Sequence, residues 1–193
     1  MIRKEWTLKH ESELRCEVND TEPLIVKLTR GSAEIFGIEM PLQKEFVFVD
    51  ENLAIFSWYG CDLETYSTPS SVLYTADSTP MIAYANTHIQ LEAMRDTALA
   101  NDVYGPNVLI VGPNDHGKST TSRILASYAV RLDRMPVFVD LDVSQGNLTI
   151  PGCLTAVVLE KNIVNVEVLF EIYIYRCSDL TLIIIDGDES CLI

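Results

Sequence analysis

The order of hydrophobic and polar positions divides the chain into two parts that meet near residue 100. From residue 6 to residue 84, short runs alternate hydrophobic and polar side chains, and turn-forming residues separate the runs. Alternation of this kind places one set of side chains on each face of a strand. We therefore expect a small all-β, sandwich-like domain whose clearest strands are residues 14–18, 24–28, 46–49 and 54–58.

The pattern changes after Asn86, where Leu91, Met94 and Ala98 recur at intervals of three and four residues in a segment without Gly or Pro. This spacing predicts an amphipathic helix. We assign it as a linking helix, so that the N-terminal β-domain with its helix covers residues 1–100.

The second part predicts a strand, a loop, a helix and another strand in succession. Residues 107–111 form a continuous apolar run that is typical of a buried parallel strand, and residues 136–142 form the next strand. The helical face between them consists of Ile124, Leu125, Tyr128, Ala129 and Leu132. This order predicts a right-handed βαβ crossover and a parallel sheet, the fold of an α/β P-loop NTPase-like domain, over residues 101–161.

Composition limits the function classes. Nearly half of the residues are hydrophobic and 22% are charged, which is typical of a globular chain. The formal net charge of -14 excludes a broad basic face for duplex nucleic acid, so any RNA contact must come from a few arginines, from aromatic stacking or from a partner. The five cysteines form no C-x-x-C pair, which argues against a zinc site and fits a reducing compartment. We expect no signal peptide and no membrane span, because the apolar run at residues 182–185 is too short.

Residues 112–119 match the phosphate-binding pattern G-x-x-x-x-G-K-[ST] between a predicted strand and a predicted helix. The backbone N–H groups of such a loop cradle phosphate oxygens, and Gly112 and Gly117 permit a geometry that a side chain would block. Lys118 would reach the β- and γ-phosphates, and Ser119 would place its hydroxyl on Mg²⁺. The alternative is an ordinary glycine turn before a helix.

Two neighbouring features admit more than one interpretation. Thr120 can add a phosphate contact, whereas His116 could act as a base or simply face solvent. Asp140 and Asp142 share one face of the second strand, where a carboxylate can hold Mg²⁺ or accept a proton from an attacking hydroxyl; they could also be solubilising acids at the end of the strand. A similar string at residues 182–189 is interpreted as an apolar tail that does not complete the sheet.

Several separate strings, together with the phosphate-binding loop, closely resemble the Clp-type polyribonucleotide 5'-hydroxyl kinases, which are subunits of the pre-mRNA cleavage machinery. They are residues 31–37, 58–61, 79–81, 86–88, 140–146 and 150–152. The resemblance implies a β-domain packed on a P-loop kinase domain that transfers the γ-phosphate of ATP, with Mg²⁺, to the 5'-hydroxyl end of RNA. It also implies a nuclear location and partner subunits in mRNA 3'-end cleavage or in tRNA splicing.

The same resemblance implies roles for particular residues. Glu13 matches the family's acidic adenine contact, and Asn52 stands where the family has a basic residue, without its charge. Lys118 and Asp142 carry over as catalytic residues, and Ser119 and Asp142 as metal ligands. The phosphate binders carry over as Gly112, Asp115, His116, Gly117, Lys118, Ser119 and Thr120. Ser144 replaces a glycine that is usual in the family.

The resemblance is expected to end near Lys161, so that residues 162–193 form a divergent tail of a shortened form. The family's arginine-bearing lid and C-terminal domain have no counterpart in these residues. Three hypotheses follow: an RNA 5'-hydroxyl kinase, a catalytically inactive ATP-binding scaffold in an RNA-processing complex, and a generic P-loop ATPase that uses Asp186 and Glu189.

Overall fold

The computed structural model describes the chain except for residues 21, 114, 142–152, 160–181 and 185–193. Its internal contacts divide the chain into two compact units, Met1–Ile82 and Ala83–Ile193. The division comes at the start of helix α1 (Met81–Ala100), whereas the sequence pattern placed this helix with the β-domain. No helix among the described residues is both long enough and apolar enough to cross a membrane.

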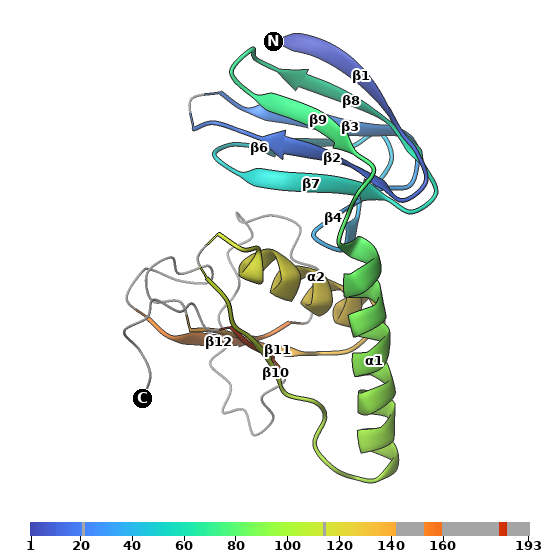
Figure 1. The fold of residues 1–193 in the computed structure, drawn as a ribbon, viewed down its shortest axis with the longest axis vertical. Coiled ribbons are helices and arrows are strands. Elements are labelled where there is room, and N and C mark those ends of the chain that lie inside the picture. The colour runs from blue at the N-terminus through green and yellow to red at the C-terminus, as the bar shows by residue number, and fades with distance from the viewer. Residues whose placement is uncertain (21, 114, 142–152, 160–181, 185–193) are drawn as a thin grey trace. The chain divides into compact units, whose positions relative to one another are not determined.

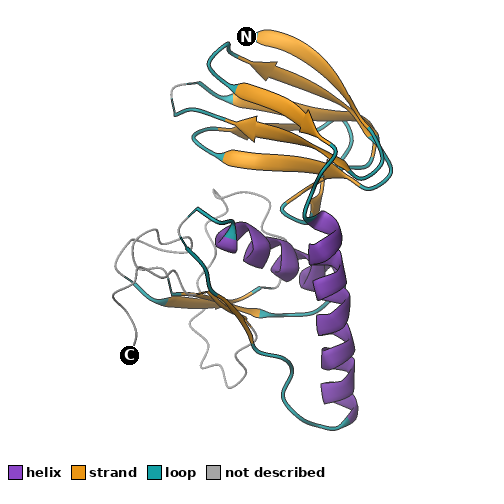
Figure 2. Cartoon of the chain, in the orientation of Figure 1, coloured by secondary structure: helices purple, strands orange, loops and turns teal. Residues whose placement is uncertain are grey.

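Apart from the first two residues of α1, the described elements of the first unit are strands (Figures 1 and 2). One antiparallel sheet has the order β1-β8-β3-β6 and the other has the order β5-β4-β7-β2-β9. The strands are β1 (Ile2–Leu8), β2 (Ser12–Glu17), β3 (Leu24–Gly31), β4 (Glu34–Ile35), β5 (Ile38–Glu39), β6 (Glu45–Phe48), β7 (Asn52–Ser57), β8 (Cys61–Ser67) and β9 (Val72–Ala76).

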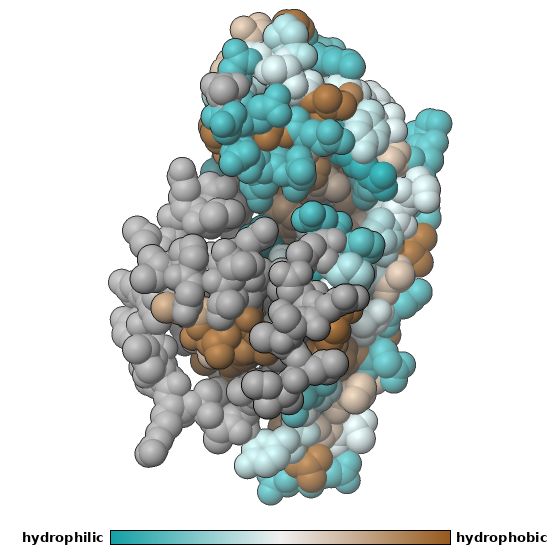
Figure 3. All heavy atoms as spheres, turned by 60° about the vertical axis from the view of Figure 1, so that its left-hand side comes forward, coloured by the Kyte–Doolittle hydropathy of each residue, from teal (hydrophilic) through white to brown (hydrophobic). Residues whose placement is uncertain are grey.

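The core of this unit follows from strict alternation along the strands. On β3, Leu24, Val26 and Leu28 are fully buried, and the residues between them are partly exposed. Side chains from both sheets join them in one hydrophobic cluster. The predicted small sandwich is therefore confirmed. The visible side of this unit is mostly hydrophilic, as its many acidic residues lead us to expect (Figure 3).

The second unit combines helices α1 and α2 with a four-stranded sheet of order β10-β13-β11-β12. Helix α2 packs on the sheet through Ala126, which joins Phe138, Val157 and Leu159 in a small buried cluster. The elements are α2 (Lys118–Arg131), β10 (Val108–Ile110), β11 (Val137–Asp140), β12 (Thr155–Val158) and β13 (Leu182–Ile184).

The predicted strand-helix-strand unit is present, but a strand from much later in the chain separates its two strands. β13 lies between β10 and β11 and is parallel to both, while β12 is antiparallel to β11. The interpretation of this segment as a tail outside the sheet was wrong for residues 182–184, because a short run of leucine and β-branched isoleucine is sufficient for a central parallel strand. The prediction that β10 is buried was also wrong for its middle residue, Leu109, which is 54% exposed.

Both predicted helical faces are correct except at one position each. Leu91 and Ala98 of α1 are buried, but Met94 is exposed. The neighbouring Arg95 takes the inward position, because Glu92 pairs with its guanidinium. On α2 the predicted face is buried except for Leu132, which follows the last helical residue as the C-cap and therefore leaves the face.

Candidate functional site

The predicted phosphate-binding loop joins β10 to α2 in the structure (Figure 1). Two of its residues have left-handed backbone conformations, with φ of 60° at Asp115 and 74° at Gly117. Residues with a Cβ atom rarely adopt this conformation, whereas glycine adopts it freely. Gly117 therefore allows the chain to turn directly into the helix that begins at Lys118.

Lys118 is held inside this loop. Its side chain is almost fully buried, with a relative exposure of 7%. Its Nζ donates a hydrogen bond of 2.8 Å to the backbone carbonyl of Pro113. The aliphatic stem passes Gly112, where an added Cβ would lie 3.7 Å from Lys118 Cδ. The loop thus encloses a positive charge at the position where a phosphate would need it.

The first turn of α2 adds partial positive charge at the same place. It contains no acidic side chain, and Gly117 supplies no side-chain cap. The N–H groups of a first helical turn lack intrahelical acceptors and favour an anion. Ser119 and Thr120, which are both partly exposed, bring two hydroxyl groups to this turn. The arrangement suits a bound phosphate.

The two histidines of this unit differ in their surroundings. His116 is exposed within the loop, as the solvent-facing alternative predicted. His88 is buried on α1, with its ring centroid 5.4 Å from that of Tyr128 on α2. Burial lowers the pKa of His88 below its ordinary value, so the neutral ring is favoured at this helix contact.

A buried carboxylate ends the second predicted strand. Asp140 is 1% exposed, at the carboxyl end of β11. Because β10, β13 and β11 are parallel, their carboxyl ends form one edge, and the phosphate-binding loop follows β10 at this edge. Asp142, the predicted catalytic and metal-binding residue, lies outside the described residues.

The described residues contain no group of three or more His, Cys, Asp or Glu side chains that could hold a metal ion. Mg²⁺ beside bound phosphates typically needs only one or two protein ligands, since phosphate and water oxygens complete its shell. The partly exposed hydroxyl of Ser119 in the first turn of α2 fits this requirement. The site is thus compatible with Mg²⁺ carried in with a nucleotide.

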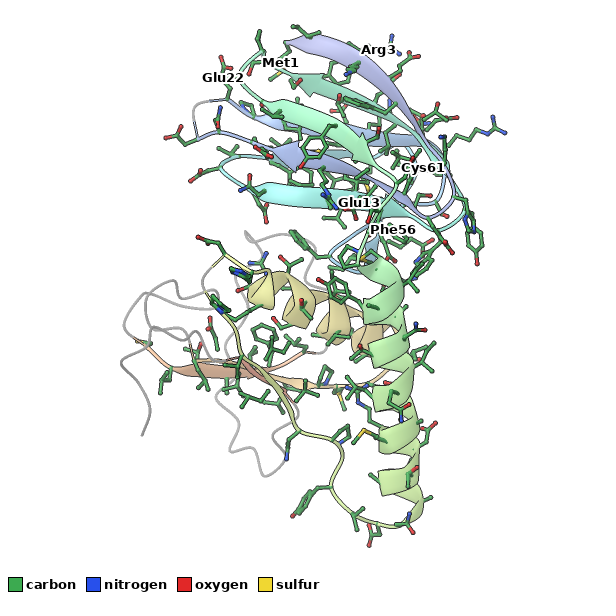
Figure 4. All side chains as sticks on the ribbon, in the orientation of Figure 1. Met1, Arg3, Glu13, Glu22, Phe56 and Cys61 are labelled. Atoms are coloured by element: carbon green, nitrogen blue, oxygen red, sulfur yellow. The ribbon has the colours of Figure 1, made fainter. Side chains whose placement is uncertain are left out.

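In the first unit, Glu13 belongs to a closed hydrogen-bonded network next to Phe56, its pairing partner on β7 (Figure 4). Glu13 is only 3% exposed. Arg15 Nε donates to one of its carboxylate oxygens at 2.7 Å, and Thr79 Oγ1 donates to the other at 2.6 Å. The Thr79 hydroxyl also accepts the N–H of Met81, the first residue of α1. Glu13 therefore anchors the start of that helix.

The structure does not bring Asn52 opposite Glu13. Asn52 is exposed and pairs with Glu17, whereas Glu13 pairs with Phe56 further along β7. The cation beside Glu13 is Arg15, and the hydrogen bond that its guanidinium donates to Glu13 raises the pKa of this guanidinium. Arg15 was not predicted as part of the site. Its spacing of two residues from Glu13 on a strand, which puts both side chains on one face, could have identified it.

Two family models match the chain. The first describes the N-terminal beta-sandwich domain of polyadenylation factor and matches residues 7–98. The second describes the P-loop of mRNA cleavage and polyadenylation factor CLP1 and matches residues 112–174. The second match extends beyond Lys161, where the resemblance was expected to end.

Curated relatives and solved structures agree with these models. The chain is 45% identical over 157 residues to the polyribonucleotide 5'-hydroxyl-kinase Clp1 of Gallus gallus, and 44% identical to that of Homo sapiens. Both alignments cover 81% of this chain and 37% of the relative, so the chain spans less than half the length of these proteins. It is also 45% identical to a CLP1 homolog of Nematostella vectensis, over 82% of this chain and 38% of that protein.

Two solved structures of Clp1p with Pcf11p are similar in fold. One was determined to describe their extended interface and the loss of ATP in a glycine-to-arginine mutant. It matches with a TM-score of 0.74 and 27% identity over 83% of this chain and 38% of that chain. The wild-type complex matches with a TM-score of 0.70 and 28% identity over 80% and 36% of the two chains.

Proposed function

Because this chain belongs to the Clp1 family, in both its β-sandwich and its P-loop domain, we propose that it binds ATP and phosphorylates the 5'-hydroxyl end of RNA. The observation that carries the proposal is Lys118, buried at the start of a helix whose first turn has no acidic residue. This is the arrangement that a triphosphate needs.

The proposed reaction forms a bond between the 5'-oxygen of RNA and the γ-phosphorus of ATP. The bond from this phosphorus to the β,γ-bridging oxygen breaks, and ADP leaves. Asp142, which follows the last residue of β11 by two positions in the sequence, is proposed to take the proton of the attacking hydroxyl. Lys118 and the first-turn N–H groups of α2 would bind the β- and γ-phosphates and stabilise the charge that shifts between them.

Mg²⁺ would be held by the hydroxyl of Ser119 and by Asp142, together with phosphate oxygens, and would supply charge neutralisation of the triphosphate. The role of Ser119 rests on its place in the first turn of α2, one residue after the buried lysine. Thr120 is proposed as a further phosphate ligand. Glu13 is proposed to contact the nucleotide base, in exchange for one of its present hydrogen bonds.

The biological setting is part of the same proposal. The relatives carry the name of an RNA 5'-hydroxyl kinase, and the matched structures contain Clp1p with Pcf11p. We infer that this chain acts in the nucleus with other subunits of the mRNA 3'-end cleavage machinery, and that tRNA splicing is a second setting. Immunoprecipitation from nuclear extract followed by mass spectrometry of the bound proteins tests this part independently of catalysis.

The kinase proposal is tested with γ-labelled ATP, Mg²⁺ and a 5'-hydroxyl RNA. The wild-type chain should label the RNA, and Lys118→Ala should abolish the labelling. Lys9→Ala, which removes an exposed lysine of the first unit, should leave it unchanged. The same RNA with a 5'-phosphate should accept no label. Labelling that survives Lys118→Ala would refute the proposal, and release of phosphate without RNA would indicate a generic ATPase instead.

A second candidate is an ATP-binding scaffold that does not turn over its nucleotide. The matched complexes favour it, because one of them concerns the loss of ATP from Clp1p bound to Pcf11p. In this case ATP should raise the melting temperature of the wild-type chain but not of Lys118→Ala, and no RNA should be labelled. Thermal melting and labelling performed on one protein preparation separate the two functions.

A further inference from the structure

The second unit contains a pocket of about 260 Å³ that the proposed nucleotide site does not use. It is formed by the last turns of α1, by the segment leading to β10 and by the segment leading to β11. The side chains that matter for its chemistry are two arginines, Arg95 and Arg134, and four apolar residues, Ala98, Leu99, Val103 and Met135.

One carboxylate, that of Glu92, pairs with both arginines of this pocket, and its side chain is 13% exposed. Arg95 Nη1 donates to one oxygen of Glu92, and Arg134 Nε donates to the other at 2.9 Å. Arg134 Nη2 also donates to Asp96 at 2.6 Å, but the Asp96 side chain is 68% exposed. Two guanidinium groups thus share a single enclosed carboxylate, and the second carboxylate lies in water at the rim.

This pairing fixes the guanidinium groups without using all of their hydrogen-bond donors. Each guanidinium has five N–H groups. Arg134 donates through Nε and Nη2, and Arg95 donates through Nη1. Among the described residues, the remaining N–H groups of these two side chains have no partner. Such donors, held in a fixed orientation, suit the two oxygens of a further carboxylate.

The apolar side chains that line the pocket are largely exposed to solvent. Leu99, Val103 and Met135 are all more than half exposed, although they stand around the two arginines. A ligand that offers only negative charge would leave this surface in contact with water. A ligand with aliphatic groups next to a carboxylate would cover the apolar side chains and use the free donors.

The pocket lies at the opposite edge of the sheet from the phosphate-binding loop. Gly105, which precedes β10, and Pro136, which precedes β11, both line it, so it is at the amino ends of these parallel strands. The phosphate-binding loop leaves the carboxyl end of β10. A ligand could therefore occupy the pocket while a nucleotide occupies the loop.

We propose that this pocket binds a segment of a partner protein in which a carboxylate side chain lies beside aliphatic side chains. RNA is disfavoured, because a phosphate backbone needs a series of cations along its path, whereas this pocket has two arginines beside exposed apolar side chains. The proposal is independent of whether the chain is a kinase.

The test is fluorescence anisotropy of the full chain with a labelled hexapeptide of alternating leucine and aspartate. We expect saturable binding below about 1 mM, the range of weak specific recognition. Replacing aspartate with asparagine in the peptide should weaken binding about tenfold or more, since a charge-assisted hydrogen bond is lost. A 5'-hydroxyl hexauridine RNA should not compete.

Variants separate the pocket from other surfaces. Arg134→Gln should weaken peptide binding about tenfold. Leu99→Ser should weaken peptide binding several-fold, and it should not affect folding because the Leu99 side chain is largely exposed. Leu154→Ser, a matched exposed leucine outside the pocket, and Lys118→Ala should bind as the wild type does. Absence of saturable binding, or equal binding by Leu99→Ser and by the wild type, would overturn the proposal. Competition by RNA that depends on Arg134 would also overturn it and indicate a nucleic-acid site.

Discussion

The described residues of the two units differ in what their buried side chains do. In the first unit, residues from both sheets form one continuous core, which includes the fully buried Leu14, Leu28 and Ile55. In the second unit, the described cluster is much smaller and centres on Phe138. The second unit also carries the phosphate-binding loop and a buried lysine. A nucleotide bound at this loop should therefore stabilise the second unit, whereas the stability of the first unit rests on its hydrophobic core.

The chain offers a separate probe for each unit. Both tryptophans, Trp6 and Trp58, belong to the first unit, so their fluorescence reports its unfolding. The described helices α1 and α2 belong almost wholly to the second unit, so circular dichroism at the helical band reports that unit. The two signals therefore distinguish the unfolding of one unit from that of the other.

The largest effect is expected from Leu28→Ala in the core of the sandwich. Leu28 is 0% exposed, and its truncation should lower the free energy of unfolding by about 2–5 kcal/mol. Urea denaturation followed by tryptophan fluorescence measures this change. Leu42→Ala is the matched control, because Leu42 is 57% exposed and its truncation should cost little. Equal losses in the two variants would show that the sandwich core does not carry the stability of the first unit.

Nucleotide should stabilise the second unit selectively. At a concentration one hundred times its dissociation constant, Mg-ATP should add about 2.7 kcal/mol to the stability of the unit that binds it. Hydrogen exchange should slow in peptides from α2 and β11 and remain unchanged in those from β3. Lys118→Ala should abolish the protection. Protection of the sandwich alone would contradict the comparison between the units.

A smaller effect is expected from Thr79→Val at the start of α1. The substitution removes the hydroxyl that donates to Glu13 and accepts from Met81. A buried carboxylate left with one donor fewer should cost about 1–3 kcal/mol in the tryptophan-detected unfolding of the first unit. Thr75→Val on the exposed side of β9 is the control and should change stability by less than about 0.5 kcal/mol.

The smallest effect is a pH dependence of the second unit. Burial is the main cause that lowers the pKa of His88; Arg95 and Arg131 lower it further, and Glu92 opposes them. The unfolded chain, whose histidine has a pKa near 6.5, therefore binds this proton more readily than the folded chain does. Stability should be complete above pH 6.5 and decrease as the pH falls below it.

Thermal melting at the helical band, repeated between pH 7 and pH 5, measures this dependence. His88→Leu, which also removes the buried Nδ1 atom that has no partner among the described residues, should flatten the acid side of the curve. An unchanged curve would mean that another group titrates. The tryptophan-detected transition of the first unit should not respond to the substitution.

Local pattern predicted much of the fold, and it failed where distant segments decide the outcome. Alternation along β3 identified the sandwich, and helical spacing identified both helices. Met94 was assigned inward by the same spacing, but the pairing of Arg95 with Glu92 decides which side chain turns in. The local sequence of β10, β11 or β13 does not predict that β13 pairs with the other two strands, because this pairing joins segments more than forty residues apart.

The candidate site was predictable where a motif fixes the backbone. Gly117 adopts the left-handed conformation that the pattern requires, and Lys118 begins the helix as expected. Part of the surroundings of Glu13 was predictable, because Arg15 lies two residues along the same strand, whereas Thr79 reaches Glu13 from a segment sixty-six residues away in the sequence. The assignments to Asp142 and to the phosphate-contacting hydroxyls remain predictions, which the labelling experiment tests.

The position of β13 has a consequence for biosynthesis. The sandwich has all of its strands once residue 76 has left the ribosome, so its antiparallel pairs can form early. β10 and β11 have no direct pairing and must wait for residues 182–184 to fill the gap between them. The nascent phosphate-binding unit therefore keeps unpaired strand edges through most of its synthesis. During this interval, chaperone capture or early nucleotide binding would have the most influence on whether it matures.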